Sequence, residues 1–367
     1  MTGCCDRCAR RSWLVGRLAG HIEKARGDRA VIRTLMALGD DELVAAVGGT
    51  RRAALMRELE RLDTATVLEG WRRSGVTTWC RHHVSYPGGL ARLPDPPAAI
   101  HLVGDPARLD ALLAGPTAAI VGARRCSADG ARIARAVGRG CSAAAVTVVS
   151  GMALGVDAAA HEGALEAGGS TVAVLAGGPD RPYPARWRTL HGEIGSRGAV
   201  ISELPPGTAS FRWGFPARNR LIAALSQMVV VVEAAERSGS LITAEIAADL
   251  GIPVGAVPGS PDRALSRATN ELIRDGSALI RDAADILDEL LGAGAYRPEP
   301  TRIEADLAEV AELVGRGLGS VAQIAGAMAD GSGVPASLTR LELLGIVERR
   351  TGGQYVPGTT PWRAAAP

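Results

Sequence analysis

The sequence predicts an α/β protein built around a doubly wound, mostly parallel β-sheet. Between residues 117 and 291, short apolar segments alternate with amphipathic segments that are long enough to form helices. The apolar segments, such as residues 228–232, are continuous runs and do not alternate with polar residues. Continuous apolar strands are typical of parallel sheets covered on both faces, and helices between them produce the doubly wound arrangement. A helical domain before this sheet and a winged helix after it complete the prediction.

The composition limits the partners that the chain can bind. Its formal net charge is only +2 over 367 residues, which argues against coating duplex DNA through bulk charge. Any nucleic-acid site must therefore be a local cluster. Arginine would form that cluster, because Lys24 is the only lysine among 41 basic residues. The planar guanidinium of arginine grips phosphate oxygens bidentately.

The N-terminus and the hydropathy pattern predict a cytoplasmic protein without membrane contact. The charged, cysteine-rich start is not followed by the apolar run of a signal peptide. No stretch reaches the roughly 18 apolar residues that a membrane span needs. Six cysteines in a chain of this length do not make a disulfide framework, so we expect a reducing compartment.

Residues 1–70 are predicted to form a cysteine-containing helical domain. Helical periodicity begins at Trp13 and continues to about Arg26, and a second run covers residues 30–38. Two further helices follow, one opening at the acidic residues 40–42 and one over residues 51–62. Short helices separated by glycine turns suggest the SAM or helix-hairpin-helix type. Such modules bind DNA or protein or serve only as packing units, so the pattern assigns no function.

The sequence offers ligands for a structural zinc site between this region and the domain behind it. Cys5 and Cys8 form a C-x-x-C pair, and Cys80 and His82, with His83 adjacent, supply a second half-site. Together they would make a Cys3His site that pins the N-terminus to the domain behind it. The alternative is that Cys80 is an ordinary strand residue and the N-terminal cysteines are unstructured. Spacing does not decide between them.

Residues 71–291 are predicted to form the sheet domain. Two strands, over residues 76–80 and 98–103, lead into it, with turns and a short helix around them. The strands of the parallel sheet are expected over residues 117–122, 146–150, 171–175, 199–202, 228–232, 253–257 and 278–280.

A Gly/Pro linker over residues 292–302 is predicted to lead to a winged helix over residues 303–357, with a disordered tail over 358–367. The winged-helix prediction rests on three helical runs and a hairpin with a Gly-Gly turn. Residues 301–367 hold six arginines and seven acidic residues, and the third helical run offers only Arg340. A helix that reads a DNA groove usually carries a basic face, so protein contact or packing is favoured here.

Arginines gather where the strands of the sheet end. Ligands of open parallel sheets bind at the carboxyl ends of the strands. The segments that follow these ends carry Arg124, Arg125, Arg186, Arg188, Arg212, Arg218, Arg220 and Arg237. Residues 215–222 place Arg218, Asn219 and Arg220 on a turn that opens a helix, and residues 238–240 place a glycine between two serines at the next helix. The edge therefore predicts a pocket for a polyphosphate backbone, with Arg218 and Arg220 gripping phosphate and Asn219 bracing the turn.

Other site types find less support in the sequence. It contains no G-x-x-x-x-G-K-[ST] motif and no complete G-x-G-x-x-G, which disfavours a P-loop NTPase and a dinucleotide site. Asp157 and His161 are four residues apart and would share one helix face as an acid/base pair. The favoured alternative is that Asp157 caps the helix and His161 fixes a loop. Ser150 and Ser240 have no evident base beside them, which disfavours a nucleophile.

Many motifs resemble, in order, those of the DNA-processing protein A (DprA/Smf) family. They span about residues 86–283: Val121-Gly-Ala-Arg124, Ser150-Gly-Met-Ala-Leu-Gly-Val-Asp157, Ala160-His161, residues 168–175, Tyr183-Pro184, Ser202-Glu203, Phe215-Pro-Ala-Arg-Asn-Arg-Leu-Ile222, Ser238-Gly-Ser-Leu-Ile-Thr-Ala244 and Pro258-Gly259. The resemblance implies an extended Rossmann-like fold with optional N-terminal helical and C-terminal winged-helix modules. It implies a single-stranded-DNA-binding protein of natural transformation that protects incoming strands and loads the RecA recombinase.

The resemblance also implies homodimers through the sheet domain, no chemical reaction and no required cofactor. Carried over residue by residue, its DNA pocket would comprise Gly122, Arg124, Ser150, Gly151, Arg188, Arg218, Asn219, Arg220, Ser238, Gly239 and Ser240, with Arg186 as a second candidate beside Arg188. Base-stacking partners near the site are expected to be Phe211, Trp213, Phe215 and Trp187. The Cys/His cluster lies outside the general pattern of the family.

Two alternative functions remain open. The turn at residues 238–240, followed by Thr243 and Glu245, superficially resembles the nucleoside-monophosphate phosphoribohydrolases, which use a related sheet. However, Leu241 and Ile242 stand where that family keeps glycine, and the double-arginine turn is foreign to it. In the second alternative the chain is a scaffold that binds proteins, and the arginine edge is incidental.

Overall fold

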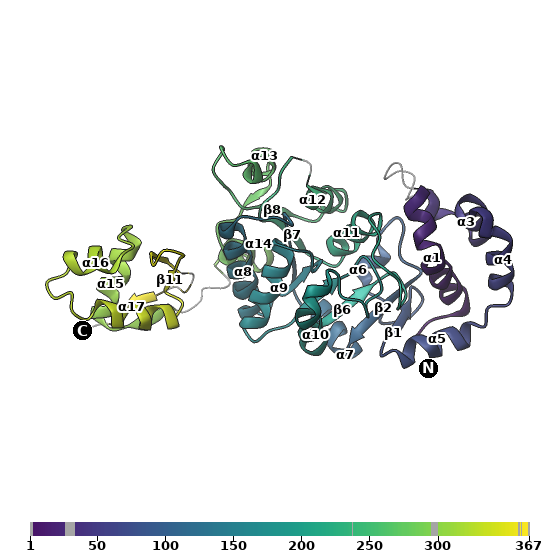
Figure 1. Cartoon of the computed structure of the whole chain (residues 1–367), viewed down its shortest axis with the longest axis horizontal. Coiled ribbons are helices and arrows are strands. Elements are labelled where there is room, and N and C mark those ends of the chain that lie inside the picture. The colour runs from purple at the N-terminus through teal and green to yellow at the C-terminus, as the bar shows by residue number, and fades with distance from the viewer. Residues whose placement is uncertain are drawn as a thin grey trace. The chain divides into compact units, whose positions relative to one another are not determined.

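The computed structural model describes residues 3–25, 34–236, 238–294, 300–358, 360 and 362–365. The chain divides into two compact units, Met1–Ala295 and Tyr296–Pro367. Figure 1 shows the first unit as a sheet covered by helices and the second as a small bundle with strands at its edge. The predicted linker over residues 292–302 falls partly outside the described residues.

A nine-stranded sheet forms the centre of the first unit. The strands lie in the order β1-β2-β6-β5-β4-β3-β7-β8-β9. Only the pairs β1–β2 and β2–β6 are antiparallel, so the predicted α/β fold with a mostly parallel sheet is confirmed. The strands are β1 (Thr77–Cys80), β2 (Ala99–Gly104), β3 (Thr117–Val121), β4 (Thr147–Ser150), β5 (Thr171–Val174), β6 (Ala199–Ser202), β7 (Met228–Val231), β8 (Val254–Ala256) and β9 (Ala278–Leu279).

The strand order reverses between β3 and β7. The chain runs from β3 outward through β4, β5 and β6, and then returns so that β7 pairs with the free side of β3. At such a switch point the loops leave neighbouring strands in opposite directions and open a crevice at the carboxyl ends. In this fold the switch point lies between the loop after β3 and the loop after β7.

Helices cover both faces of the sheet, as continuous apolar strands require. Leu221, Ile222 and Ala247 pack with Val172 on one face, and Leu190 packs with neighbouring strand residues on the other. The helices of this part are α6 (Gly88–Ala91), α7 (Pro106–Ala114), α8 (Ala128–Ala143), α9 (Val156–Glu166), α10 (Arg188–Arg197), α11 (Gly214–Ala224), α12 (Gly239–Asp249), α13 (Arg267–Arg274) and α14 (Ala283–Leu291), with 3-10 turns η2 (Ala185–Trp187) and η3 (Ala264–Ser266).

The N-terminal helices belong to the same compact unit as the sheet. They are α1 (Asp6–Ala25), α3 (Asp40–Val47), the 3-10 turn η1 (Gly49–Arg51), α4 (Arg52–Glu60) and α5 (Thr64–Arg73). The helix α1 begins before the predicted start at Trp13, and residues 30–33 of the second predicted helix lie outside the described residues.

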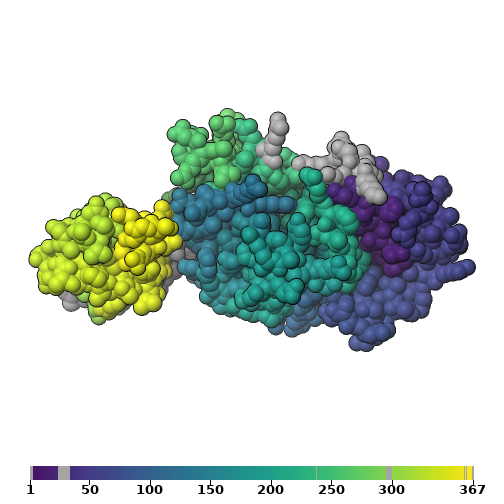
Figure 2. All heavy atoms as spheres, in the orientation of Figure 1, coloured from purple at the N-terminus to yellow at the C-terminus, as the bar shows by residue number. Residues whose placement is uncertain are grey.

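One tryptophan of the sheet domain completes the core of these N-terminal helices. Trp213 is buried among leucines of α1, α3 and α4, and its indole Nε1 donates to the Ala19 carbonyl at 2.9 Å. The space-filling view shows the N-terminal helices, in purple, pressed continuously against the sheet region (Figure 2). The two parts therefore share a core, although their sequences differ in character.

The second unit contains three helices and two small sheets. The helices α15 (Ala305–Gly315), α16 (Val321–Ala327) and α17 (Val334–Leu343) precede an antiparallel hairpin of β11 (Val347–Arg349) and β12 (Tyr355–Pro357). This is the element order that a winged helix requires, and the winged-helix assignment itself stays a prediction.

The ends of this unit differ from the prediction. The expected disordered tail contains β13 (Trp362–Ala364), which pairs in parallel with β10 (Thr301–Ile303). The linker was expected to include residues 301 and 302, which open β10. The buried Ile303 anchors that strand to the core of the unit, and Trp362 packs against the same core. Residues 362–364 therefore form a strand because β10 offers a pairing partner, which the composition of the tail did not reveal.

Among the described helices, none combines the length and the apolar character that crossing a membrane requires.

Candidate nucleic-acid interface

The loops after β3 and β7 are joined directly at the switch point. The Ala123 amide donates to the Glu233 carbonyl at 2.7 Å. A Cβ atom on Gly122 would lie 2.7 Å from Val156 Cγ2 and 3.0 Å from the same carbonyl. Gly122, which the resemblance placed in the DNA pocket, is therefore in close contact with the protein's own chain.

The N-terminus of α8 holds a carboxylate of the protein itself. The Glu233 carboxylate accepts from the Ser127 amide at 2.8 Å and from Ser127 Oγ at 2.5 Å. Ser127 caps the helix, since its Oγ accepts from the Gly130 amide at 3.0 Å. Arg124, which precedes this helix, was expected in the DNA pocket. Because Glu233 already occupies the favourable position for an anion, the phosphate contact must lie elsewhere.

Asp157 and His161 are engaged in holding the structure together. The Asp157 carboxylate accepts from the amides of Gly151 and Ala153 at 3.2 and 3.4 Å. Burial raises its pKa, while the Arg218 charge opposes that rise. His161 Nδ1 lies 2.8 Å from Thr171 Oγ1, and burial lowers the His161 pKa to about 3. A neutral, enclosed imidazole argues against acid/base catalysis. His161 has a structural role, but its partner Thr171 opens β5 and is not in a loop. The predicted cap is wrong, because Gly155 is the N-cap of α9 and Asp157 instead holds the loop before it.

Arg218 lies beneath the loop after β4 and is almost fully buried. Its Nη1 donates to the Val174 carbonyl at 2.7 Å. Burial lowers its pKa to about 10, with Asp157 raising it and Arg124 lowering it. A Cβ atom on Gly151 would lie 1.6 Å from Arg218 Nη1, so glycine is required there by this guanidinium. In this arrangement Arg218 supplies positive potential under the edge and has little surface with which to touch a phosphate directly.

Arg220 does not share a pocket with Arg218. It forms ion pairs with Asp95 at 3.0 Å and Glu203 at 2.7 Å, and only 11% of its side chain is exposed. The prediction placed both arginines on a turn, but α11 begins at Gly214 and holds them in its interior. Side chains two apart on a helix point about 200° away from each other, so the two cannot line one site. The phosphate grip expected of Arg220 is therefore corrected to a structural ion pair.

The serine-rich turn before α12 is held by its own hydroxyls and by Asn219. Ser238 caps α12, and its Oγ lies 2.7 Å from Ser240 Oγ. The Asn219 side-chain amide donates to the Gly239 carbonyl at 3.0 Å, so it braces the turn before α12 rather than the turn at residues 215–222 for which bracing was predicted. Ser150 is fully buried and donates to the Ile120 carbonyl at 2.6 Å. Arg237 lies outside the described residues.

An exposed cation stacked on aromatic rings forms the accessible part of the edge. The Arg124 guanidinium lies 4.2 Å from the centre of the Phe215 ring, and the Phe215 and Tyr183 rings are 5.5 Å apart and tilted by 50°. We call these three residues the Arg124 stack. The sequence prediction did not include Tyr183, although its place in the loop after β5 is the signal that would have found it. Further exposed arginines of the predicted set are Arg125, Arg186, Arg188 and Arg212.

The predicted stacking residues divide into two groups. Trp213 is buried in the N-terminal helical core, and Phe211 packs against that core. Trp187 is half-buried, with the Arg186 guanidinium 5.0 Å from its ring centre. Phe215 and Trp187 are the two predicted stacking residues that meet an exposed arginine, Arg124 and Arg186 respectively.

Two other features involve the N-terminal helices. A cavity of about 900 Å³ separates the N-terminal helices from residues 94–99, and Arg220 with Glu203 forms part of its wall. The four predicted zinc ligands, Cys5, Cys8, Cys80 and His82, come together where α1 meets the end of β1. The site residues carried over from the resemblance thus form a buried supporting layer and an exposed layer.

Comparison with known proteins gives matches over most of the chain. The sequence model of the family DNA recombination-mediator protein A matches residues 77–291. The putative DNA processing protein DprA of Mycobacterium tuberculosis strain H37Rv is 40% identical over 274 residues, which are 71% of this chain and 69% of that protein. The DNA processing protein DprA of Streptococcus pneumoniae is 38% identical over 253 residues, 69% of this chain and 86% of that protein.

Two solved structures are also similar. The X-ray structure of DprA from Streptococcus pneumoniae has a TM-score of 0.61 at 33% identity, covering 77% of this chain and 96% of that one. A structure of DprA from Helicobacter pylori, described as showing a single-stranded DNA binding mode, has a TM-score of 0.52 at 30% identity. It covers 59% of this chain and 95% of that one.

Proposed function

The chain belongs to the DNA recombination-mediator protein A family, whose members carry the names DprA and Smf, and on that premise we propose that it binds single-stranded DNA at the strand-end edge of its sheet. The observation that carries the proposal is the Arg124 stack, an exposed guanidinium on an aromatic pair above the switch point. The similar protein from Helicobacter pylori is described as binding single-stranded DNA.

The chemistry of the exposed layer suits a flexible nucleic-acid strand. Arg124, Arg186 and Arg188 offer planar forks to phosphate oxygens. Tyr183 is 48% exposed and presents a ring on which a base can stack. Base stacking contributes about 1–3 kcal/mol per base and tolerates any sequence, so we expect weak sequence preference. With a net charge of only +2, the affinity must come from this local group.

The buried layer supports the exposed layer in this proposal. Arg218 lies under the loop after β4 and Asp157 holds the amides of that loop. Asn219 ties α11 to the turn before α12. These contacts fix the loops so that phosphate contacts need little reorganisation on binding. Arg218 adds positive potential beneath a phosphate seated above it.

Family membership supports the wider role. We propose that the protein acts in DNA processing during natural transformation, protects incoming single strands and loads the RecA recombinase without catalysing a reaction of its own. Formation of homodimers through the sheet domain and a cytoplasmic location belong to the same proposal. The C-terminal unit, with balanced charge and no strongly basic third helix, is proposed to contact protein.

The enzymatic alternative has less support from the site. His161 and Asp157 are buried and hydrogen-bonded within the protein, and Ser150 donates to the Ile120 carbonyl. Incubation with nucleoside monophosphates should release no free base above the buffer control. Release of many equivalents of free base per chain would establish phosphoribohydrolase activity and overturn the non-enzymatic proposal.

The test is fluorescence anisotropy with a labelled oligothymidylate and its duplex, titrated at several salt concentrations. The Arg124→Ala change should weaken single-strand binding about tenfold, since a charged hydrogen bond contributes roughly 1.5–3 kcal/mol. It should also reduce the slope of log affinity against log salt by about 0.7 for the lost phosphate contact.

Arg274→Ala is the matched control. Arg274 is equally exposed but ends α13, at the opposite edge of the sheet from the strand ends. The single-strand affinity and the salt slope of the Arg274→Ala variant should equal those of the unchanged protein. An Arg124 variant with unchanged affinity, or an equal loss in the Arg274 variant, would contradict binding at the strand-end edge.

A further inference from the structure

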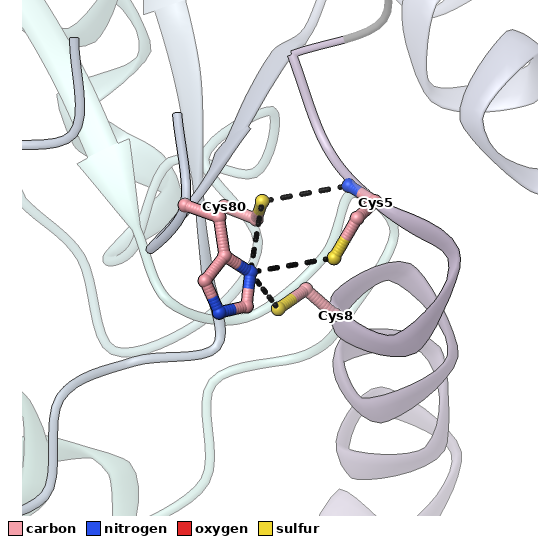
Figure 3. A group of neighbouring side chains, drawn as sticks. Cys5, Cys8 and Cys80 are labelled. Atoms are coloured by element: carbon pink, nitrogen blue, oxygen red, sulfur yellow. Dashed lines mark hydrogen bonds between the residues drawn. The ribbon is translucent and has the colours of Figure 1, made fainter. Parts of the chain in front are cut away.

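Four potential metal ligands from two separated segments converge at the junction of α1 and β1. Cys5 stands directly before α1 and Cys8 is in its first turn, while Cys80 ends β1 and His82 follows two residues later. Their ligating atoms all lie within 4.8 Å of one another. Figure 3 shows the labelled cysteines pointing toward one imidazole nitrogen from the helix on one side and the strand end on the other.

The distances fit the edges of a tetrahedron around zinc. His82 Nδ1 lies 3.4 Å from Cys5 Sγ, 3.6 Å from Cys8 Sγ and 3.9 Å from Cys80 Sγ. Zinc–sulfur bonds of about 2.3 Å and zinc–nitrogen bonds of about 2.0 Å at tetrahedral angles give sulfur–nitrogen edges of about 3.5 Å. The side chains therefore stand where a Cys3His site needs them.

Hydrogen bonding alone does not account for this convergence. A ring nitrogen of neutral histidine offers either one proton or one lone pair. It can serve one of the three sulfurs that surround it, so this bond does not explain why the other two also lie within 4 Å of the same nitrogen. A central cation, by contrast, gives every one of these four groups a favourable partner.

We propose that Cys5, Cys8, Cys80 and His82 bind one structural zinc ion that fastens the first turn of α1 to the edge strand of the sheet. The four protein ligands fill the tetrahedral shell, so the ion has no open position for a substrate. This inference does not depend on DNA binding at the switch point, because Cys80 and His82 belong to the edge strand β1 and the residues after it, and four strands separate β1 from β3.

Neighbouring groups select these four residues. His83, the other histidine of the pair, accepts from the Ser85 amide at 3.1 Å and stacks on Trp79. The His83 ring is therefore held by these contacts and lies outside the group of four converging ligands. Backbone contacts order the two segments: the Cys80 amide donates to the Gly3 carbonyl at 3.0 Å, and the Cys5 amide donates to Cys80 Sγ at 3.4 Å. Donors to coordinating sulfur are a common support of thiolate ligands.

The ion would add a tie at the first turn of α1, where Asp6 accepts from Thr64 Oγ1 at 2.7 Å. The C-terminal half of α1 is anchored by Trp213, through the Ala19 carbonyl and the Glu23 carboxylate. The first turn meets the sheet through the small buried cluster of Cys4, Cys8, Ala9, Cys80 and Ala99. A metal tie there closes the long chain segment between Cys8 and Cys80, where a crosslink restricts the unfolded chain most.

The experiment is metal analysis of the full chain, purified under reducing conditions without chelator. We expect one zinc ion per chain, and Cys8→Ser and Cys80→Ser variants should each lose it. Cys126→Ser is the matched control, because Cys126 is a partly exposed free thiol outside the cluster. It should keep one zinc ion. Cobalt exchanged into the site should give the visible absorption of a tetrahedral thiolate complex.

A second measurement does not depend on the folding of variants. Alkylation of the unchanged protein, read out by mass spectrometry, should be slow at Cys5 until a chelator is added, whereas Cys126 should react equally in both conditions. Zinc content far below one per chain after zinc loading and desalting would overturn the proposal. So would full zinc content in the Cys8 variant, or a Cys5 alkylation rate that the chelator does not change.

Discussion

Replacing Arg220 by methionine distinguishes a structural ion pair from a phosphate contact. The change removes the guanidinium and keeps a side chain of similar length that can pack. Arg220 donates to the Asp95 carboxylate at 3.0 Å and the Glu203 carboxylate at 2.7 Å. We expect Arg220→Met to destabilise the first unit and to leave single-strand affinity nearly unchanged.

The magnitude follows from which carboxylate is left buried. Breaking a buried ion pair from one side costs about 3–5 kcal/mol. The Asp95 side chain is 24% exposed and can regain water, but only 9% of the Glu203 side chain is exposed. The loss should therefore be near the lower end, about 3 kcal/mol. Adding Glu203→Gln removes the unpaired charge, so the double variant should be more stable than Arg220→Met alone.

The assay is urea unfolding followed by fluorescence, together with anisotropy on the same samples. The unfolding midpoint of Arg220→Met should fall without a change in slope. Arg263→Met is the control, because Arg263 is 58% exposed with one ion pair at 3.3 Å, and such pairs contribute about 0–1 kcal/mol.

The opposite pattern would refute the structural interpretation. If Arg220→Met kept its unfolding midpoint but lost single-strand affinity by about tenfold or more, Arg220 would be a DNA contact. A double variant no more stable than the single one would show that Glu203 does not depend on Arg220.

Two further predictions concern the buried layer. Gly151→Ala places a Cβ atom 1.6 Å from Arg218 Nη1 and breaks the bond to Val174, so the urea midpoint should reveal a loss of about 2–4 kcal/mol. An unchanged midpoint would show that the guanidinium relocates without cost. Burial lowers the pKa values of His101 and His161 from 6.5 to about 3, so below pH 6.5 the unfolded chain binds protons that the folded chain does not. The free energy of unfolding should therefore fall with falling pH, by on the order of 1.4 kcal/mol per pH unit for each histidine. Urea titrations at several pH values should show a smaller dependence of this free energy on pH in His101→Asn, and an unchanged dependence would contradict the role of His101.

The strands were predictable because their signal is local. Continuous apolar runs such as residues 228–232 mark a strand buried on both faces whatever its neighbours are. The observed β7, Met228–Val231, matches that run closely. The arginines of the strand-end edge were also predictable, because every loop after a parallel strand reaches the same edge.

The partners of those arginines depend on strand order and helix phase, which the local pattern does not contain. Glu233 meets Ser127 only because β7 returns beside β3. Arg220 turns toward Asp95 only because α11 begins at Gly214 rather than after the arginines. Long-range pairing also decided whether Cys8 and Cys80 would meet. In each instance the residue type was visible in the sequence, but its neighbour was fixed by the fold.

The division of the edge into two layers changes how loss of binding should be interpreted. A variant that lacks both Arg218 and Arg220 loses the side chain that supports the loop after β4. It also loses the cation that pairs with Glu203. Its loss of DNA affinity would follow from disordered loops even if neither side chain touched DNA. Arg124 is exposed and its guanidinium stacks on the half-buried Phe215 ring, so we expect its removal to leave the loops folded. A loss confined to the Arg124 variant, at full stability, is therefore the result that locates the DNA strand on this surface.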